Sequence, residues 1–226
     1  MQKPSTRELY DYWNRLRGAR PAPDRREIDP TCIRTALANA FILQLTDDGE
    51  YDFRLAGSHL CAAYSRELKD RSFSRLWHER DRDAIETLIR AVTEDNAVAL
   101  VTFQGSTAIG TKVAIETILL PLRHNGSPNA RILGAMTALD EPYWFGVQPI
   151  LEQRITGLRL IWPDETGASD FGTHRAAVPV AGNGPAPVEA LRGLETGGVP
   201  TPVAGQLYGR AARRYAHLAV IDGGRN

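Results

Sequence analysis

Three extended runs follow one another in the middle of the chain, and this order constrains the fold more than any other feature. They cover about residues 97–104, 112–122 and 131–139, and the segments between them, GSTAIG and RHNGSPNA, carry turn residues. Strands joined by connections this short pair antiparallel, because a parallel pair needs a crossover of a dozen or more residues. The sequence therefore predicts an antiparallel sheet.

A second strand pair comes earlier in the chain. The runs AFILQL and YDFRLAG are separated by TDDGE, whose Asp48 and Gly49 form a strong hairpin signal. Between the two groups of strands, Ser58 is placed to begin a short helix, and a longer helix with apolar side chains at helical spacing begins near Asp81. Helices inserted between strands of one antiparallel sheet predict an α+β domain, with the helices over one face.

The N-terminus predicts an amphipathic helix over residues 6–17. Ser5 and Glu8 have the spacing of a capping box. Four apolar side chains then recur on one face of this helix: Leu9, Tyr12, Trp13 and Leu16. A stripe this aromatic needs a surface to cover it.

Composition excludes several classes of protein. The 27 basic and 27 acidic residues cancel, so no overall field attracts nucleic acid or an anionic membrane. The longest apolar runs, such as ILLPL and VALVTF, are far too short to cross a bilayer, and the N-terminus has no apolar signal region. Two cysteines are too few for a disulfide framework or a structural zinc site. These features indicate a soluble, cytoplasmic protein that does not bind nucleic acid or membranes.

The chain divides into four predicted segments. A stretch rich in glycine and proline follows the last apolar run and has too little apolar surface to order itself, which predicts a flexible linker. The tail after it carries Arg210, Arg213 and Arg214, which we interpret as a solvated helix face rather than a nucleic-acid contact. The segments are an N-terminal helical segment at 1–37, a domain at 38–163, the linker at 164–204 and the tail at 205–226.

No pattern in the sequence predicts catalysis or metal binding. GSTAIG lacks the lysine and hydroxyl pair of a phosphate loop, and no serine elbow is present. The histidines have neither the helical spacing nor the neighbouring cysteines of a metal site. His59 or His78 has the chemistry to ligate a haem, although a capping or surface role suits His78 better, and Cys61 is expected to be a small buried apolar side chain. The sequence thus predicts a protein that is not an enzyme, and it identifies no cofactor.

The segment YSRELKDRSFSRLWHERDRDAIETLIRAV, residues 64–92, resembles PAS domains. The resemblance covers about residues 38–140, and together with the later EPYWFG it is closest to a divergent, alphaproteobacterial-type group of stand-alone bacterial PAS proteins. Asp70 stands where many relatives have glycine, and Glu79 replaces the usual proline. The asparagine-cysteine-arginine-phenylalanine motif of flavin-binding relatives is absent.

The resemblance implies a PAS-like five-stranded sheet whose concave face is walled off by helices around a pocket or a filled core. Ten side chains are expected to point into it: Phe53, Leu55, Leu60, Tyr64, Trp77, Leu88, Ile89, Val101, Phe103 and Ile118. The implied function is a sensory or regulatory protein that binds a small molecule there and signals through protein partners. The alternative is a constitutive adaptor or scaffold with a ligand-free, filled core.

The resemblance also bears on assembly. In PAS relatives a helix that precedes the domain packs on the outer face of the sheet or on its copy in a second subunit. We expect a homodimer through Leu9, Tyr12, Trp13 and Leu16. A monomer whose helix folds back on its own sheet is the alternative, and it buries the same stripe.

Overall fold

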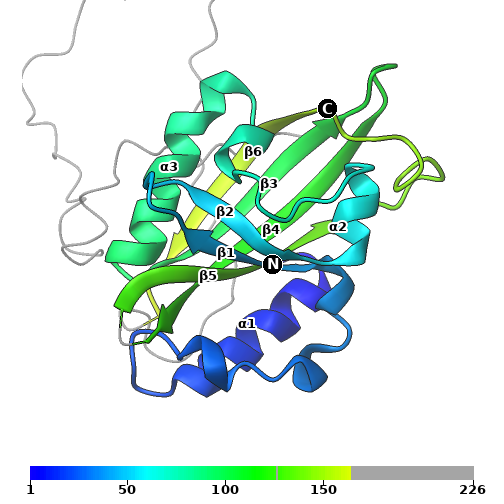
Figure 1. Cartoon of the computed structure of the whole chain (residues 1–226). Helices are drawn as coiled ribbons and strands as arrows, with labels where there is room; N and C mark the ends of the chain where they lie inside the picture. The colour runs from blue at the N-terminus through cyan, green and yellow to red at the C-terminus, as the bar shows by residue number, and fades with distance from the viewer. Residues whose placement is uncertain (126, 164–226) are drawn as a thin grey trace, which may run out of the picture.

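The computed structural model describes residues 1–125 and 127–163, which form one six-stranded antiparallel sheet with helices on both faces (Figure 1). The strand order is β2-β1-β5-β4-β3-β6. The strands are β1 (Ala40–Leu45), β2 (Tyr51–Ala56), β3 (Val98–Ser106), β4 (Lys112–His124), β5 (Ser127–Ala138) and β6 (Glu152–Ile161). The helices are α1 (Pro4–Arg17), α2 (Ser58–Ala63) and α3 (Glu79–Glu94), with 3-10 turns η1 (Arg25–Glu27), η2 (Pro30–Ile33), η3 (Leu37–Asn39) and η4 (Ser74–Leu76).

The predicted α+β class and the first five strands are confirmed, but the strand count of five is wrong. The sixth strand, β6, pairs antiparallel along the whole of β3. The alternation of its side chains between the two faces of the sheet is broken by a bulge. Thr102 pairs with Gly157 and Phe103 with Ile155, which leaves Thr156 as an extra residue. Charged side chains at Glu152, Arg154 and Arg159 also lie exposed on this edge strand, so the apolar pattern is weak.

The first face of the sheet is covered by α2, η4 and α3 (Figure 1). His78 caps α3, because its Nδ1 accepts a hydrogen bond from the Arg80 backbone N–H at 3.2 Å, and this confirms the capping role expected for it. The helix ends at Glu94 with Asp95 as its C-cap, and Asn96 follows with a φ of +54°. Asp70 also adopts the left-handed conformation, with a φ of +60°, at the position where relatives carry glycine.

The opposite face of the sheet is covered by α1, which folds back on its own chain (Figure 1). The Trp13 indole N–H donates to the Pro121 carbonyl at 2.8 Å, and both Leu9 and Trp13 are fully buried. The expected homodimer interface through Leu9, Tyr12, Trp13 and Leu16 is therefore wrong, because the sheet of the same chain already covers this stripe. Whether the protein dimerises through another surface stays a prediction.

A carboxylate from the sheet caps α1 in place of the predicted capping box. The helix begins at Pro4, so Ser5 lies inside it, and its hydroxyl contacts the Thr137 hydroxyl instead. Glu116 on β4 is fully buried and accepts from the backbone N–H groups of Gln2 at 2.8 Å and Lys3 at 3.4 Å. These backbone donors at the helix start have no partner within the helix, and the helix dipole favours a negative charge there.

We expect Glu116→Ala to lower the free energy of unfolding by about 1–3 kcal/mol, because two backbone donors at the start of α1, in partly buried hydrogen bonds, lose their acceptor. Chemical denaturation measures this change. Glu116→Gln keeps an acceptor oxygen and should recover part of the loss. An alanine variant as stable as the native chain would mean that Glu116 does not hold the start of α1.

Two predicted segments lie outside the described residues: the linker at 164–204 and the tail at 205–226, including Arg210, Arg213 and Arg214. The four-segment division therefore stays a prediction. Within residues 1–125 and 127–163, no helix is long and apolar enough to cross a membrane.

Candidate functional site

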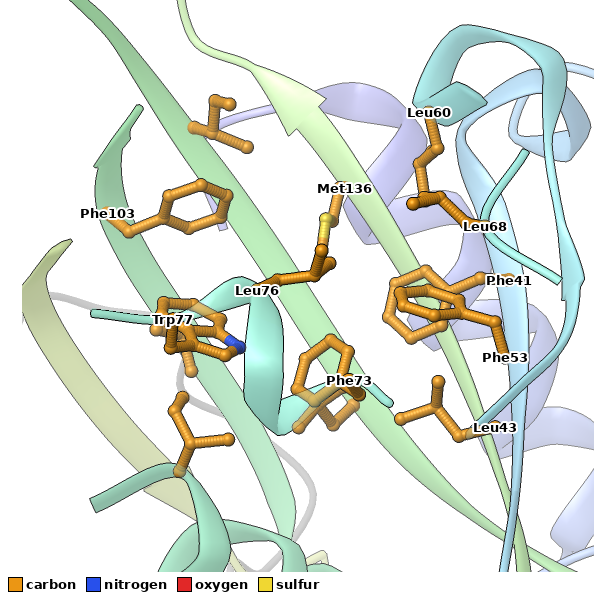
Figure 2. Packing of buried hydrophobic residues seen from close by; sticks show 14 of the residues in the cluster. Phe41, Leu43, Phe53, Leu60, Leu68, Phe73, Leu76, Trp77, Phe103 and Met136 are labelled. Carbon is orange, nitrogen blue, oxygen red and sulfur yellow. The ribbon is translucent and has the colours of Figure 1, made fainter. Parts of the chain in front are cut away.

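The space between the sheet and α2, η4 and α3 is where the sequence predicts a pocket, and we call the buried side chains that occupy it the inner core. Five aromatic rings form a connected series through it (Figure 2). Neighbouring ring centroids in this series lie 4.9–5.8 Å apart, mostly in edge-to-face or tilted arrangements. Such pairs stabilise a core beyond their area burial. The rings belong to Phe41, Phe53, Phe73, Trp77 and Phe103.

Eight of the ten predicted side chains are in the inner core. They come from segments that are far apart in sequence: β2, α2 with the residue that follows it, the residue after η4, and then α3 and β3. Their burial confirms the predicted direction of these side chains, while a role in contacting a ligand stays a prediction. The eight are Phe53, Leu60, Tyr64, Trp77, Leu88, Ile89, Val101 and Phe103.

The prediction for Leu55 is wrong, because this side chain is 47% exposed on the opposite face of the sheet. In the β1–β2 pair, Leu43 lies opposite Phe53 and Ile42 opposite Leu55, so Arg54 is an extra residue in β2. A β-bulge of this kind reverses the inward parity of the residues that follow it. Phe53 before the bulge and Ala56 after it therefore contact the inner core, and Leu55 does not.

The prediction for Ile118 is wrong by one position along β4. Ile118 is buried beneath α1, in the cluster that also contains Leu9, Trp13 and Leu120 and that we call the outer core. Its neighbour Leu119 faces the inner core. Because β4 is covered on both faces, its apolar residues follow one another without alternation. The sequence therefore does not show which of them face the inner core.

The inner core is filled by its own side chains. One hollow beside the inner core, between α2 and the strands β4 and β5, has a volume of about 10 Å³ and is lined in part by Leu60, Tyr64, Ile115 and Met136. A space of this size holds about one water molecule. An organic ligand would need several of these side chains to move.

One buried polar pair lies inside this apolar packing. The Tyr64 hydroxyl, at the end of α2, donates to the Oε1 atom of Gln153 on β6. Burial raises the pKa of the Tyr64 hydroxyl, so it stays protonated and acts as a donor. The Gln153 Nε2 and Trp77 Nε1 atoms are also buried and have no hydrogen-bond partner among the described residues. These two donors are the polar groups through which the interior could recognise a ligand.

Tyr64→Phe should lower the free energy of unfolding by about 1–2 kcal/mol, because the Gln153 carbonyl oxygen then stays buried without a donor. Gln153→Leu should cost a similar amount, by stranding the tyrosine hydroxyl. The double variant should lose less than the sum of the two, since it leaves neither group unpaired. Additive losses in a double-mutant cycle by urea denaturation would show that the two side chains do not interact.

A family model described as a PAS domain matches residues 1–137 of the 226, a range that runs from α1 into β5. The chain belongs to the PAS domain family. This confirms the resemblance that residues 64–92 indicated, and the matched range also includes α1.

Solved structures of PAS and LOV domains are also similar to this PAS protein. The light-state LOV domain of the blue-light photoreceptor Aureochrome1 is 16% identical, with a TM-score of 0.38 over 50% of this chain and 90% of that chain. The LOV domain of a blue-light activated histidine kinase from Erythrobacter litoralis is 17% identical, with a TM-score of 0.37 over 46% and 96%. A PAS domain from Colwellia psychrerythraea is 14% identical, with a TM-score of 0.37 over 49% and 97%. No curated protein matches the chain.

The cysteine and histidine of α2 lie outside the inner core of this PAS domain. The His59 side chain is exposed. Cys61 is half-buried, with its Sγ 3.7 Å from the Glu67 Oε1 atom, so the expectation of a buried apolar cysteine is wrong. The buried side chains of α2 are Leu60 and Ala63, and Cys61 lies one residue beyond Leu60, off the face that these two form. Over the described residues, no three metal-ligating side chains gather at one point.

Gln153 is the residue of the candidate site that sequence reasoning missed. It lies on β6, which was not predicted as a strand, and its burial is unusual for an uncharged amide. The signal in the sequence is weak: Gln153 and Ile155 alternate with charged residues for only one period before the Thr156 irregularity.

Proposed function

We propose that this PAS protein is a non-enzymatic regulatory module that acts through contacts of its surface with a protein partner, while its interior serves as a filled structural core. The observation that carries the proposal is the packing of the inner core, where five connected rings pack with the aliphatic side chains around them and the hollow beside α2 has a volume of only about 10 Å³. This favours the adaptor alternative over the small-molecule sensor with an internal pocket.

The energetics of the aromatic series support the same proposal. Trp77 is 1% exposed and contacts both Phe73 and Phe103, with centroid distances of 5.8 and 4.9 Å. Moving a side chain of this size out of the core costs about as much as truncating it, roughly 3–5 kcal/mol. A ligand that enters the interior must offset that cost before any net binding results.

The loop between β5 and β6 offers an apolar surface for a partner. Tyr143, Val147 and Leu151 are 93%, 76% and 64% exposed on it. The loop is nevertheless anchored: the Ile150 N–H donates to the Ala63 carbonyl at 2.9 Å, and Trp144 is buried in the inner core. An apolar surface held on a fixed frame is typical of a protein interaction site.

Comparative purification tests the proposal. The tagged native chain and the variant Tyr143→Asp/Leu151→Asp are isolated from the source cells in parallel, with Arg80→Gln on the exposed start of α3 as the matched control. We expect a stoichiometric partner with the native chain and the control, and its loss from the double aspartate variant. A partner retained equally by all three chains, or no partner with any of them, contradicts the proposed role of the loop.

A second candidate function is favoured by one observation. The buried Trp77 Nε1 and Gln153 Nε2 donors have no partner among the described residues, and a small polar molecule in the interior would satisfy them. This candidate predicts that purified protein carries a small molecule and that Gln153→Leu loses it. Protein that carries none in either form supports the filled core.

A further inference from the structure

An open groove of about 430 Å³ lies on the face of the sheet opposite the inner core, beside the segment that follows α1. It is formed by β1, β2 and β5, by η1 and by the loop after α2. Its volume falls in the range of small-molecule sites. The lining side chains are Arg25, Ile42, Arg54, Leu55, Lys69 and Arg131.

Positive charge dominates this groove. Four of its six lining side chains are basic, and none is acidic. Lys69 forms a 3.9 Å ion pair with Asp70, but both side chains are well exposed to solvent, where such a pair contributes little. Arg131 donates one hydrogen bond, from Nη2 to the Gln44 Oε1 atom at 3.2 Å, and that partner is neutral.

The arginines of the groove keep unused donors. The Nε atoms of Arg25 and Arg131 are buried and have no hydrogen-bond partner among residues 1–125 and 127–163. Burial, and then the positive charges of Arg25 and Arg54, lower the pKa of the Arg131 guanidinium, which shows that the three groups lie close enough to repel. A folded chain that gathers mutually repelling cations with unused donors favours a negatively charged ligand.

We propose that this groove binds a small phosphorylated molecule that has at least two negative charges and an apolar or planar body. Arginine presents its donors in a planar fork that matches phosphate oxygens, and three arginines line this groove. The exposed Leu55 and the neighbouring Ile42 supply an apolar floor between the cations, which gives a role to the leucine that the β2 bulge turns away from the inner core. A bare anion would leave this floor uncovered.

This site is independent of the proposed partner loop and of the inner core. Arg54 and Leu55 lie on the edge strand β2, whereas the loop with Tyr143 and Leu151 connects β5 to β6. A failure of either proposal therefore leaves the other intact.

Calorimetric titration of the full chain with AMP and with inorganic pyrophosphate, at constant ionic strength, tests the proposal. We expect both to bind, AMP with an additional contribution from its base, and both to raise the melting temperature. Arg54→Gln, an exposed position that should not impair folding, and Arg131→Gln should each weaken AMP binding by about tenfold or more, because a hydrogen bond to a charged group is lost. Leu55→Ser should weaken AMP but not pyrophosphate.

The matched control is Arg80→Gln, which removes the same charge from the start of α3 and should leave binding unchanged. Sodium chloride at equal ionic strength should not reproduce the melting shift. The proposal is overturned if sodium chloride or citrate acts as strongly as pyrophosphate, if Arg54→Gln binds AMP like the native chain, or if a single-stranded oligonucleotide binds far more tightly than AMP. The last result would assign the groove to a nucleic-acid contact instead.

Discussion

Trp77→Ala should lower the free energy of unfolding by about 3–5 kcal/mol. The indole is 1% exposed and links Phe73 on one side to Phe103 on the other, so its removal both loses buried apolar area and interrupts the aromatic series. The surrounding strands of a six-stranded sheet cannot close the space left behind. Urea denaturation followed by far-ultraviolet circular dichroism measures the change.

Two matched variants show whether burial causes the effect. Trp77→Phe keeps a ring in the same place and removes an indole N–H that has no partner among the described residues, so it should cost less than the alanine variant. Tyr143→Ala removes a ring that is 93% exposed and should change stability by no more than about 0.5 kcal/mol. Unchanged stability in Trp77→Ala would contradict the placement of this side chain.

Gly57→Ala should lower the free energy of unfolding by about 3 kcal/mol, which is the upper end of the usual cost of adding a carbon atom to a well-packed interior. A Cβ at this position would lie 2.3 Å from the Ala38 carbonyl oxygen and 2.5 Å from that of Leu37. Both neighbours are backbone atoms of η3, so they cannot rotate away. The glycine is needed for this close approach rather than for an unusual turn, because its φ of −68° is open to any residue.

Gly110→Ala provides the comparison for a glycine of the other kind. Gly110 has a φ of +81°, and a methyl group added to it would meet no atom within 4 Å. Alanine there should therefore cost only the strain of a left-handed backbone, about 1–2 kcal/mol. Thermal and urea unfolding of both variants should rank Gly57→Ala as the more damaging. The reverse order would show that η3 and the start of α2 can separate to admit a side chain.

Local signals in the sequence determine much of the fold. The extended runs on either side of the Asp48 and Gly49 turn predict β1 and β2 with their observed bounds, except that β2 ends at Ala56 and not at Gly57. Gly49 has the φ of +81° that such a turn needs. The apolar spacing and acid-rich turn predict α3, although they place its start near Asp81 and the helix begins at Glu79. These elements are predictable because their turns and caps are made by neighbours in the chain.

Features set by distant parts of the chain were not predictable. The capping of α1 by Glu116 joins residues more than a hundred positions apart, so a local capping box was the only visible candidate. The face of the sheet on which Leu55 lies depends on a bulge in β2 against β1. The face on which Ile118 lies does not show in the sequence, because β4 is buried on both faces. β6 is stabilised by pairing with β3 and has little pattern of its own.

The candidate site divides in the same way. Tyr64 and Trp77 were identified from one continuous segment that carries the PAS resemblance. Gln153, the acceptor of the Tyr64 hydroxyl, lies outside that segment and could not be joined to it without the sheet order. The basic groove was also not visible, since it brings together one arginine each from η1, β2 and β5.

Native mass spectrometry of the protein purified from its own source cells shows whether the PAS interior is filled by its own side chains or by a ligand. The Arg54→Gln variant is used, so that an anion held in the basic groove does not obscure the result. If the interior is filled by its own side chains, we expect the mass of the polypeptide alone. A stoichiometric small molecule that stays bound in Arg54→Gln and is lost when Gln153→Leu is added would contradict it.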